Sequence, residues 1–407
     1  MAEKNRQKLM QISQKPGNNV CADCGDKDPE WTSCSIGIFL CQECAGIHRS
    51  LGTESRVRSS RLDNWDTEQL EYMDGVGNDK AKQKYEMCVP AFYRRPKKND
   101  PNVVKKEWIL GKYLRFEFTE PAQQMAYTSQ RKEGNLMKLG RDRRLYQSRK
   151  FVIDRAENKL SYYVIEDSGK VKSSSSFMSP ASRSSYSFHS KQSTPKPKAE
   201  INLDEVNAVF VPEKMGNPYG LQITYYKNGS TRCLYLYSEN SKEIVDWYNA
   251  IRAAKLERRQ IAFPDRTLEQ LSEDLTRDFT LEGWLSKMGP RHEPFKRRWF
   301  TLDRRKLSYF EDPLNAFAKG EVFIGHKDAG YSVTIGAPED QSNCGEYCFQ
   351  LHVPDRDYVM RAETKDEMEQ WVEALKKVVE LPLTPQDTKL ASILVSKKSN
   401  SIRLYRN

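Results

Sequence analysis

Two close pairs of cysteines near the start of the chain constrain its fold more than any other feature. Cys21 and Cys24 form the first pair, Cys41 and Cys44 form the second, and sixteen residues separate the pairs. A gap of two residues lets both thiolates of a pair reach one ion, and the spacer returns the chain to bring in the second pair. Four thiolates complete a tetrahedral shell with no open position. The spacing therefore predicts one structural zinc ion, which contributes about 10–16 kcal/mol to folding.

Four other residues are weighed as metal ligands and set aside. Cys34 lies between the two pairs and His48 lies just after them, but the quartet already fills the shell. We predict that Cys34 is a small buried residue and that His48 packs in the interior or lies at the surface. Cys344 and Cys348 have a looser spacing without a second pair nearby, so no metal is predicted there.

The composition is typical of a soluble globular protein. Hydrophobic residues make up 38% and charged residues 30% of the chain. Its length of 407 residues is enough for about three domains. No apolar run approaches the ~18 residues that a membrane helix needs, and the N-terminus lacks the apolar core of a secretory signal. We therefore expect a cytoplasmic protein with reduced thiols, where close cysteine pairs favour metal over disulfides.

The charge balance favours a polyanionic partner. Lysines and arginines exceed aspartates and glutamates by 10, at 66 against 56. Such an excess favours nucleic acid, an anionic membrane or inositol phosphates, and charge alone does not choose among them.

Helical spacing dominates the first ~125 residues after the cysteine ribbon. Asp63 or Asp66 is placed to cap a helix that carries Leu70 and Met73. A second predicted helix carries apolar residues at helical spacing, which are Val104, Trp108, Ile109, Tyr113 and Phe116. These side chains are expected to form the core of the first domain.

Two later segments resemble each other, which indicates a duplicated domain. They begin at Glu133-Gly and Glu282-Gly and pass through a basic loop into an apolar strand. A strand containing tyrosine follows, and each segment ends in an amphipathic helix that carries Trp247 or Trp371. Short strands closed by one helix predict a small barrel with a helix across its mouth. The serine-rich stretch over about 168–199 has almost no aliphatic residues, so we predict a disordered insertion within the first repeat.

The residues around the quartet point to a specific family. Arg49 follows the last cysteine in the pattern C-x2-C-x16-C-x2-C-x4-R, with Asp28-Pro-Glu-Trp31 upstream and Val57-Arg-Ser-Ser-Arg61-Leu-Asp63 downstream. Together these closely resemble the zinc-finger module of GTPase-activating proteins for the Arf (ADP-ribosylation factor) family. The resemblance implies that Arg49 acts as an arginine finger, supplied in trans to the active site of an Arf-family GTPase. Trp31 either shapes the surface around Arg49 or packs against the ribbon.

The repeated segments resemble pleckstrin homology (PH) domains, and the order of the whole chain resembles the Arf GTPase activators with dual PH domains, of the centaurin-alpha type. The resemblance implies a multidomain α+β fold, with a helical zinc-ribbon domain before two PH barrels that each end in a closing helix. The implied domains are a zinc-finger domain over 1–127, a first PH domain over 130–255, a linker over 256–278, a second PH domain over 279–382 and a tail over 383–407.

The phosphoinositide-binding pattern of PH domains is K-x-G, a variable loop, then K-x-R followed by apolar residues. The second repeat matches it with Lys287-Met-Gly289, Lys296-Arg-Arg298 and the strand residue Tyr309. The first repeat keeps Lys138-Leu-Gly140 and Tyr162 but has Ser148-Arg149-Lys150 as its later triplet. Arg141, Arg143 and Arg144 of its loop are available to compensate. The implied lipid-binding residues are Lys138, Arg149, Lys150, Tyr162, Lys287, Lys296, Arg298 and Tyr309.

The resemblance implies a GTPase activator that is not itself an enzyme. Its PH domains are expected to bind phosphatidylinositol 3,4,5-trisphosphate and the soluble inositol tetrakisphosphate headgroup, which recruits a cytoplasmic monomer to the anionic inner plasma membrane. One alternative is a lipid-responsive adaptor whose zinc module merely binds a GTPase or the cytoskeleton. A nucleic-acid-binding zinc ribbon is disfavoured, because the basic residues concentrate in the barrel loops rather than beside the ribbon.

Overall fold

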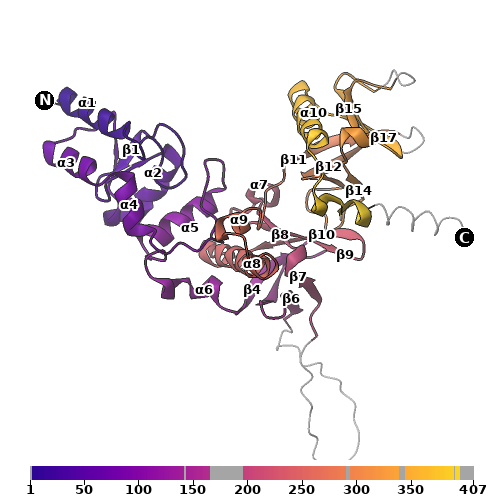
Figure 1. Cartoon of the computed structure of the whole chain (residues 1–407), viewed down its shortest axis with the longest axis horizontal. Coiled ribbons are helices and arrows are strands. Elements are labelled where there is room, and N and C mark those ends of the chain that lie inside the picture. Colours follow the sequence, from indigo (N-terminus) through magenta and orange to yellow (C-terminus); the bar gives the residue numbers. More distant parts are fainter. Residues whose placement is uncertain are drawn as a thin grey trace, which may run out of the picture. The chain divides into compact units, whose positions relative to one another are not determined.

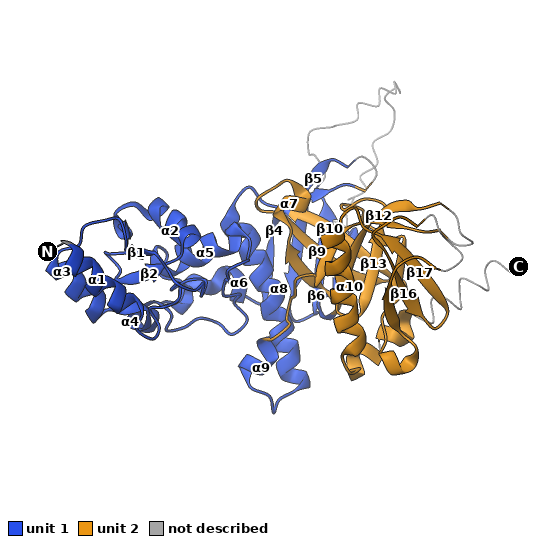
Figure 2. Cartoon of the chain, turned by 90° about the horizontal axis from the view of Figure 1, so that it is seen from above, with its two compact units in different colours: residues 1–140, 144–204, 237–272 blue, residues 141–143, 205–236, 273–407 orange. Residues whose placement is uncertain are grey.

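The structure is a computed structural model, and it describes residues 2–141, 144–165, 196–289, 294–338, 344–388 and 390–394. Most of the serine-rich insertion predicted over about 168–199, the loop residue Arg143 and the end of the predicted tail lie outside these residues. The chain forms two compact units (Figure 2), the first with residues 1–140, 144–204 and 237–272 and the second with 141–143, 205–236 and 273–407. In the described part, no helix is long and apolar enough to cross a bilayer.

The first unit begins with a small antiparallel ribbon among helices (Figure 1). The strand order is β2-β1-β3, and Trp31 of β1 pairs with Leu40 on one side and Ser59 on the other. The elements are α1 (Ala2–Ser13), β1 (Trp31–Ser33), β2 (Ile38–Leu40), α2 (Gln42–His48), the 3-10 helix η1 (Arg49–Glu54), β3 (Val57–Ser59), α3 (Thr67–Gly75), α4 (Gly77–Tyr85), α5 (Asn102–Tyr113), η2 (Pro121–Gln124) and α6 (Met125–Thr128). The sequence prediction placed helices only after the ribbon, whereas α1 precedes it and packs Leu9 and Ile12 against the same core as Phe39.

The two helices predicted from apolar spacing are present, with one end corrected. Asp66 caps α3, where its side chain accepts a hydrogen bond from the Gln69 backbone in a full capping box. Asp63 instead accepts a hydrogen bond from the Ser59 amide, at 2.6 Å. Phe116 lies beyond the end of α5, with a φ of 54°. Its side chain is therefore carried out of the helical stripe and is 42% exposed.

Two seven-stranded antiparallel sheets follow, each succeeded by a long helix. The first has the order β7-β6-β5-β4-β10-β9-β8 and the second the matching order β14-β13-β12-β11-β17-β16-β15. The first comprises β4 (Arg131–Leu139), β5 (Tyr146–Asp154), β6 (Lys159–Val164), β7 (Ala199–Asn202), β8 (Asn207–Phe210), β9 (Leu221–Lys227) and β10 (Ser230–Tyr237), with η3 (Leu203–Glu205), α7 (Pro212–Met215), α8 (Ser241–Ala262) and α9 (Leu268–Ser272). The second comprises β11 (Leu281–Lys287), β12 (Lys296–Asp303), β13 (Lys306–Phe310), β14 (Gly320–Phe323), β15 (Ser332–Ile335), β16 (Cys348–Val353) and β17 (Arg356–Arg361), with η5 (Lys327–Ala329) and α10 (Lys365–Glu380). The duplication predicted from sequence is therefore confirmed, because the two sheets have the same strand order.

The repeated Glu-Gly and tryptophan signals meet in space. A Cβ on Gly134 would contact the ring of Trp247 at 3.6 Å, and one on Gly283 would contact the ring of Trp371 at 3.8 Å. Each glycine thus lies beside the tryptophan of the closing helix, at a distance where even a Cβ would make an ordinary contact. In the second unit, α10 buries Trp371 and its apolar neighbours against the inner face of the second sheet.

Helix α8 is buried on more than one side. While Trp247 packs against Phe151 of the first sheet, other α8 residues contact the zinc-bearing part of the same unit. Ser241 Oγ donates to Glu107 at 2.6 Å, and Tyr248 OH accepts from Arg94 Nη1 at 3.1 Å. The closing helix of the first sheet therefore also holds the preceding helical domain.

One pair of cysteines differs from the expectation of reduced thiols. Cys344 and Cys348 form a disulfide, with their Cα atoms 6.1 Å apart. The four-residue separation brings the chain back over this short distance, within the range that disulfides span. No metal was predicted for this pair, and the disulfide occupies both sulfurs.

Candidate functional sites

The four cysteines of the predicted quartet lie together in the interior. All four Sγ atoms are within 4.8 Å of one another, and those of Cys24 and Cys41 are 3.6 Å apart. Sulfurs on a regular tetrahedron with zinc–sulfur bonds of about 2.3 Å lie about 3.8 Å apart, so the arrangement fits one zinc ion. Cys41 caps the start of α2 and Cys44 lies in its first turn. The β1–β2 hairpin thus brings the second pair back to the first.

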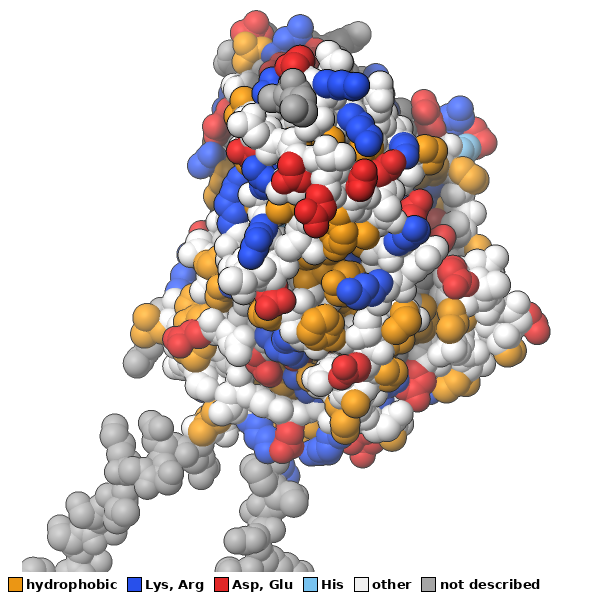
Figure 3. All heavy atoms as spheres, turned by 90° about the vertical axis from the view of Figure 1, so that its left-hand side faces the viewer, with side chains coloured by type: hydrophobic (Ala, Val, Ile, Leu, Met, Phe, Trp, Pro, Cys, Tyr) orange, Lys and Arg blue, Asp and Glu red, His pale blue; other side chains and the backbone are white. Residues whose placement is uncertain are grey.

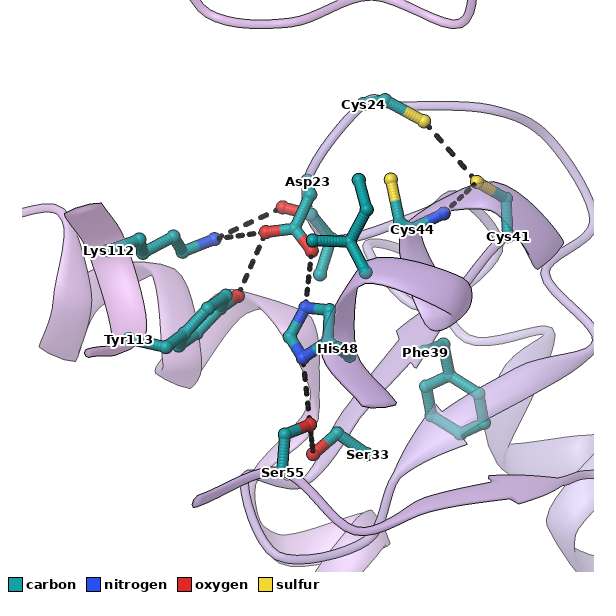
Figure 4. A network of polar contacts seen from close by, with 12 residues as sticks. Asp23, Cys24, Ser33, Phe39, Cys41, Cys44, His48, Ser55, Lys112 and Tyr113 are labelled. Carbon is teal, nitrogen blue, oxygen red and sulfur yellow. Dashed lines mark hydrogen bonds and ion pairs between the residues drawn. The ribbon is translucent and has the colours of Figure 1, made fainter. Parts of the chain in front are cut away.

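A buried polar network surrounds His48, which is fully buried (Figure 4). Its Nε2 lies 2.9 Å from Asp23 Oδ2, and its Nδ1 lies 2.8 Å from Ser55 Oγ. Asp23, between the cysteines of the first pair, also accepts hydrogen bonds from Tyr113 OH at 3.1 Å and Lys112 Nζ at 3.3 Å. The network joins the zinc-binding loop to the end of α2 and to α5. His48 therefore packs in the interior, one of its two predicted placements, and has a polar partner at each ring nitrogen. Cys34, predicted to be buried, is half-buried, with its Sγ 3.2 Å from the Arg56 carbonyl.

The network keeps Asp23 ionised inside the protein. Burial raises the pKa of this carboxyl, but the charges of Lys112 and His48 and their hydrogen bonds outweigh burial and lower the pKa to about 2. Lys112 also forms an ion pair with Glu86 at 2.9 Å. Sequence reasoning missed this network, although Lys112 lies four residues after Trp108 and so falls on the apolar face of its helix. A single lysine on such a face signals a buried ion pair.

Arg49 lies at the surface directly after this network. It is the first residue of η1, and its backbone amide donates to the last turn of α2. Its guanidinium carbon lies 4.5 Å above the centre of the Trp31 ring. Of the two roles weighed for Trp31, the structure shows direct contact with Arg49, which restricts where an exposed arginine points.

The residues predicted to bind lipid in the second repeat lie together. Lys287 ends β11 and pairs with Lys296 across the strands, and Arg298 lies two residues along β12 on the same face. The Nζ of Lys287 lies 5.4 Å from the ring of Tyr309 and 5.6 Å from that of Tyr358. These side chains form a basic site walled by tyrosines. Sequence reasoning missed Tyr358 because no pattern linked β17 to the basic loop.

The strand register moves the predicted site of the first repeat by one residue. Lys138 pairs with Gln147 just as Lys287 pairs with Lys296, so Arg149 corresponds to Arg298. Lys150 is the next residue along β5 and lies on the opposite face, where its Nζ is 3.3 Å from Glu133. The triplet that corresponds to Lys296-Arg-Arg298 is therefore Gln147-Ser-Arg149. Lys150 lies outside the candidate site.

The first repeat still concentrates positive charge. Lys138 Nζ lies 5.4 Å from the Tyr162 ring, the same arrangement as in the second repeat. Burial, followed by the charge of Arg149, lowers the pKa of Lys138. The negative charge of a bound anion would offset both effects, because it favours the charged form of the lysine. On the face shown in Figure 3, lysine and arginine side chains lie among acidic and apolar ones.

Comparisons with known proteins identify the domains that carry these candidate sites. Residues 6–122 match the ArfGap family, described as "Putative GTPase activating protein for Arf", and residues 130–256 and 279–380 match the PH domain family. Arf-GAP with dual PH domain-containing protein 2 from Mus musculus is 40% identical over 389 residues, covering 94% of this chain and 95% of that protein. The protein of the same name from Homo sapiens is 40% identical over 396 residues, covering 96% and 97%.

One solved structure resembles the first domain of the chain. The ArfGap domain of HIV-1 Rev binding protein is 26% identical, covers 30% of this chain and 92% of that chain, and has a TM-score of 0.27. The long relatives carry the conclusion, since they span nearly the whole chain at 40% identity. The chain belongs to the Arf GTPase-activating proteins with dual PH domains, and its buried cysteine quartet is the structural zinc site of the ArfGap domain.

Proposed function

We propose that this chain accelerates GTP hydrolysis on an Arf-family GTPase by placing Arg49 in the partner's nucleotide site. The observation that carries the proposal is the exposed Arg49 held on Trp31, at the end of a helix whose start carries two zinc ligands. Hydrolysis develops negative charge on the transferring phosphoryl group, and an arginine supplied in trans neutralises it, for about 10³–10⁵ in rate. The planar guanidinium can reach two phosphate oxygens at once.

The basic sites of the two PH domains suit recruitment to a membrane. Clustered cations at the ends of strands match a headgroup with several phosphates, and we propose phosphatidylinositol 3,4,5-trisphosphate and inositol tetrakisphosphate as their ligands. Each basic residue near an anionic membrane adds about 1 kcal/mol without regard to headgroup. The protein would then move from the cytoplasm to the inner plasma membrane as a monomer, beside its membrane-attached GTPase.

The test is a single-turnover assay of Arf-bound GTP, with vesicles that contain or lack the trisphosphate lipid. We expect stimulation by the wild type, stronger with the lipid, and a loss of at least about 10³-fold in Arg49→Lys, by the magnitude known for arginine fingers. Zinc content measured on both proteins controls for folding. Full activity of Arg49→Lys with zinc retained would exclude the finger role. No stimulation by the wild type on any vesicle would favour the adaptor alternative instead.

A further inference from the structure

Strand β17 forms one side of the candidate headgroup site in the second PH domain. In the sheet order, β11 lies between β12 and β17. Lys287 of β11 pairs with Lys296 on one side and with Met360 on the other. Side chains alternate along a strand, so Arg356 and Tyr358 share the face of Met360. Lys287 lies on this face too, because paired residues of antiparallel strands point to the same side of the sheet.

Two tyrosines of the site contact the Arg356 side chain. Its Nη2 donates to the Tyr358 hydroxyl, and its guanidinium carbon lies 4.2 Å from the centre of the Tyr358 ring. Burial, followed by the neighbouring Tyr358, raises the pKa of Tyr309, whereas the charge of Arg356 and its hydrogen bond to Tyr309 act in the opposite direction. Arg356 therefore lies beside the same two tyrosine side chains as Lys287.

These contacts orient the exposed guanidinium of Arg356 without neutralising its charge, because tyrosine hydroxyls and rings are uncharged partners. Two aspartates flank Arg356 in the sequence. Asp355 lies in the turn before β17, and Asp357 lies on the other face of the strand. There Asp357 Oδ1 lies 2.8 Å from His352 Nδ1. The face of β17 that carries Lys287's neighbours thus presents an oriented positive charge.

The first repeat carries an arginine at the matching position. Arg356 precedes Trp371 by fifteen residues, and Arg232 precedes Trp247 by the same number. Arg232 belongs to β10, which has the place in the first sheet that β17 has in the second. The phosphoinositide-binding pattern of the basic loop does not include this position. An arginine in the strand before the closing helix is therefore a second basic feature that the two repeats share.

We propose that Arg356, held by Tyr358, is a further headgroup-binding residue of the second PH domain. It would donate to a phosphate of a polyphosphorylated inositol ring on the side of β11 away from β12. The planar guanidinium can give two parallel hydrogen bonds to one phosphate. Cations on both sides of the central strand suit a ring that carries phosphates around its edge. This inference rests on the proposed headgroup binding and extends the site from the basic loop to β17.

The test measures the second site in the full chain. Lys138→Ala/Arg149→Ala removes cations from the first site, and calorimetric titration with inositol tetrakisphosphate then reports the second. In this background we expect Arg356→Ala to weaken binding about 10-fold, the lower end of the range for a hydrogen bond to a charged group. Arg297→Ala is the matched control and should leave the affinity unchanged. Arg297 lies between two site residues of β12 but on the other face, where it pairs with Glu363 at 2.9 Å.

A second variant tests the role of the tyrosine. Tyr358→Phe keeps the ring but removes the hydroxyl that accepts from Arg356, so it should weaken binding about 2- to 5-fold. It should cause no further loss once Arg356→Ala is present, and losses that add would refute the holding role of Tyr358.

Unchanged affinity of Arg356→Ala, or an equal loss in Arg297→Ala, overturns the proposal. Weaker binding of Arg356→Ala to phosphatidylserine vesicles, without a loss for the free headgroup, also overturns it, because this indicates general attraction to an anionic surface. A background variant that binds no headgroup at all refutes the proposed headgroup binding of the second PH domain itself.

Discussion

Replacing Lys112 with methionine tests whether the buried network holds the zinc-binding domain together. Lys112 is 1% exposed and pairs with two buried carboxylates, Asp23 at 3.3 Å and Glu86 at 2.9 Å. Methionine fills a similar volume without the charge. The change therefore leaves both carboxylates in the interior and removes a cation that they share.

The expected loss follows from what remains around each carboxylate. Removing one partner of a buried ion pair costs about 3–5 kcal/mol, because a charge stays buried without compensation. Asp23 keeps its contacts with His48 and Tyr113, and Glu86 keeps its ion pair with Arg95. We therefore expect the lower end of that range, about 3 kcal/mol.

Lys105 of the same helix supplies the control. Its side chain is 4% exposed, but its partner Glu43 is 70% exposed and returns to water when the lysine is lost. Lys105→Met should therefore cost only about 0–1 kcal/mol, as for a surface ion pair. The two variants share helix, residue type and substitution, and differ in the number and the burial of the carboxylates that each lysine pairs with.

Zinc release during guanidinium unfolding, followed with a chromophoric chelator, reports this domain within the full chain. A loss of about 3 kcal/mol shifts the midpoint down by about 0.5–1.5 M at the slopes usual for small domains. Equal midpoints for Lys112→Met and Lys105→Met would refute the reasoning, since the buried carboxylates would then not need their lysine.

Three further predictions address other parts of the chain. Arg149→Ala should weaken binding of inositol tetrakisphosphate in titration calorimetry, while Lys150→Ala should leave it within about twofold, as expected of a residue outside the site. Chelation of zinc under mild denaturant should unfold the ArfGap domain and leave the thermal transition of the second PH domain in place, as differential scanning calorimetry would show. Leu375→Ala, in the core under α10, should cost about 2–5 kcal/mol in thermal unfolding, against little for its exposed neighbour Glu373→Ala.

Local patterns predicted the parts of the fold that depend on neighbours in sequence. The cysteine quartet, a helix cap at Asp63 or Asp66 and the duplication that ends in Trp247 and Trp371 were predicted from local patterns. Each is present, with the cap at Asp66. The end of α5 was placed too late, because Phe116 has helical spacing but itself adopts left-handed backbone beyond the helix end. Apolar residues can continue at helical spacing after the backbone has left the helix, so their spacing does not locate the helix end.

Strand register explains why one site residue was misplaced. The triplet pattern was matched by residue type, which aligned Lys150 with Arg298 and ignored the alternation of faces along β5. Pairing across the strands aligns Arg149 with Arg298 instead. A shift of one residue in a strand moves a side chain to the other face of the sheet. Residue type alone does not fix such a position. The repeat does, because Phe151 pairs with Gly134 just as Phe300 pairs with Gly283, and this alignment makes Arg149 equivalent to Arg298.

The position of Arg49 depends on contacts that no local pattern shows. Zinc ligands fix the start of α2 at Cys41 and Cys44, while the far end is fixed by His48, the residue directly before Arg49. His48 in turn contacts Asp23, which lies between the other two ligands. The zinc site therefore restrains the position of Arg49 in two ways. One restraint acts along α2, and the other acts through the contact between Asp23 and His48. A structural metal site can in this way determine the position of the arginine that we propose to act on a partner's nucleotide.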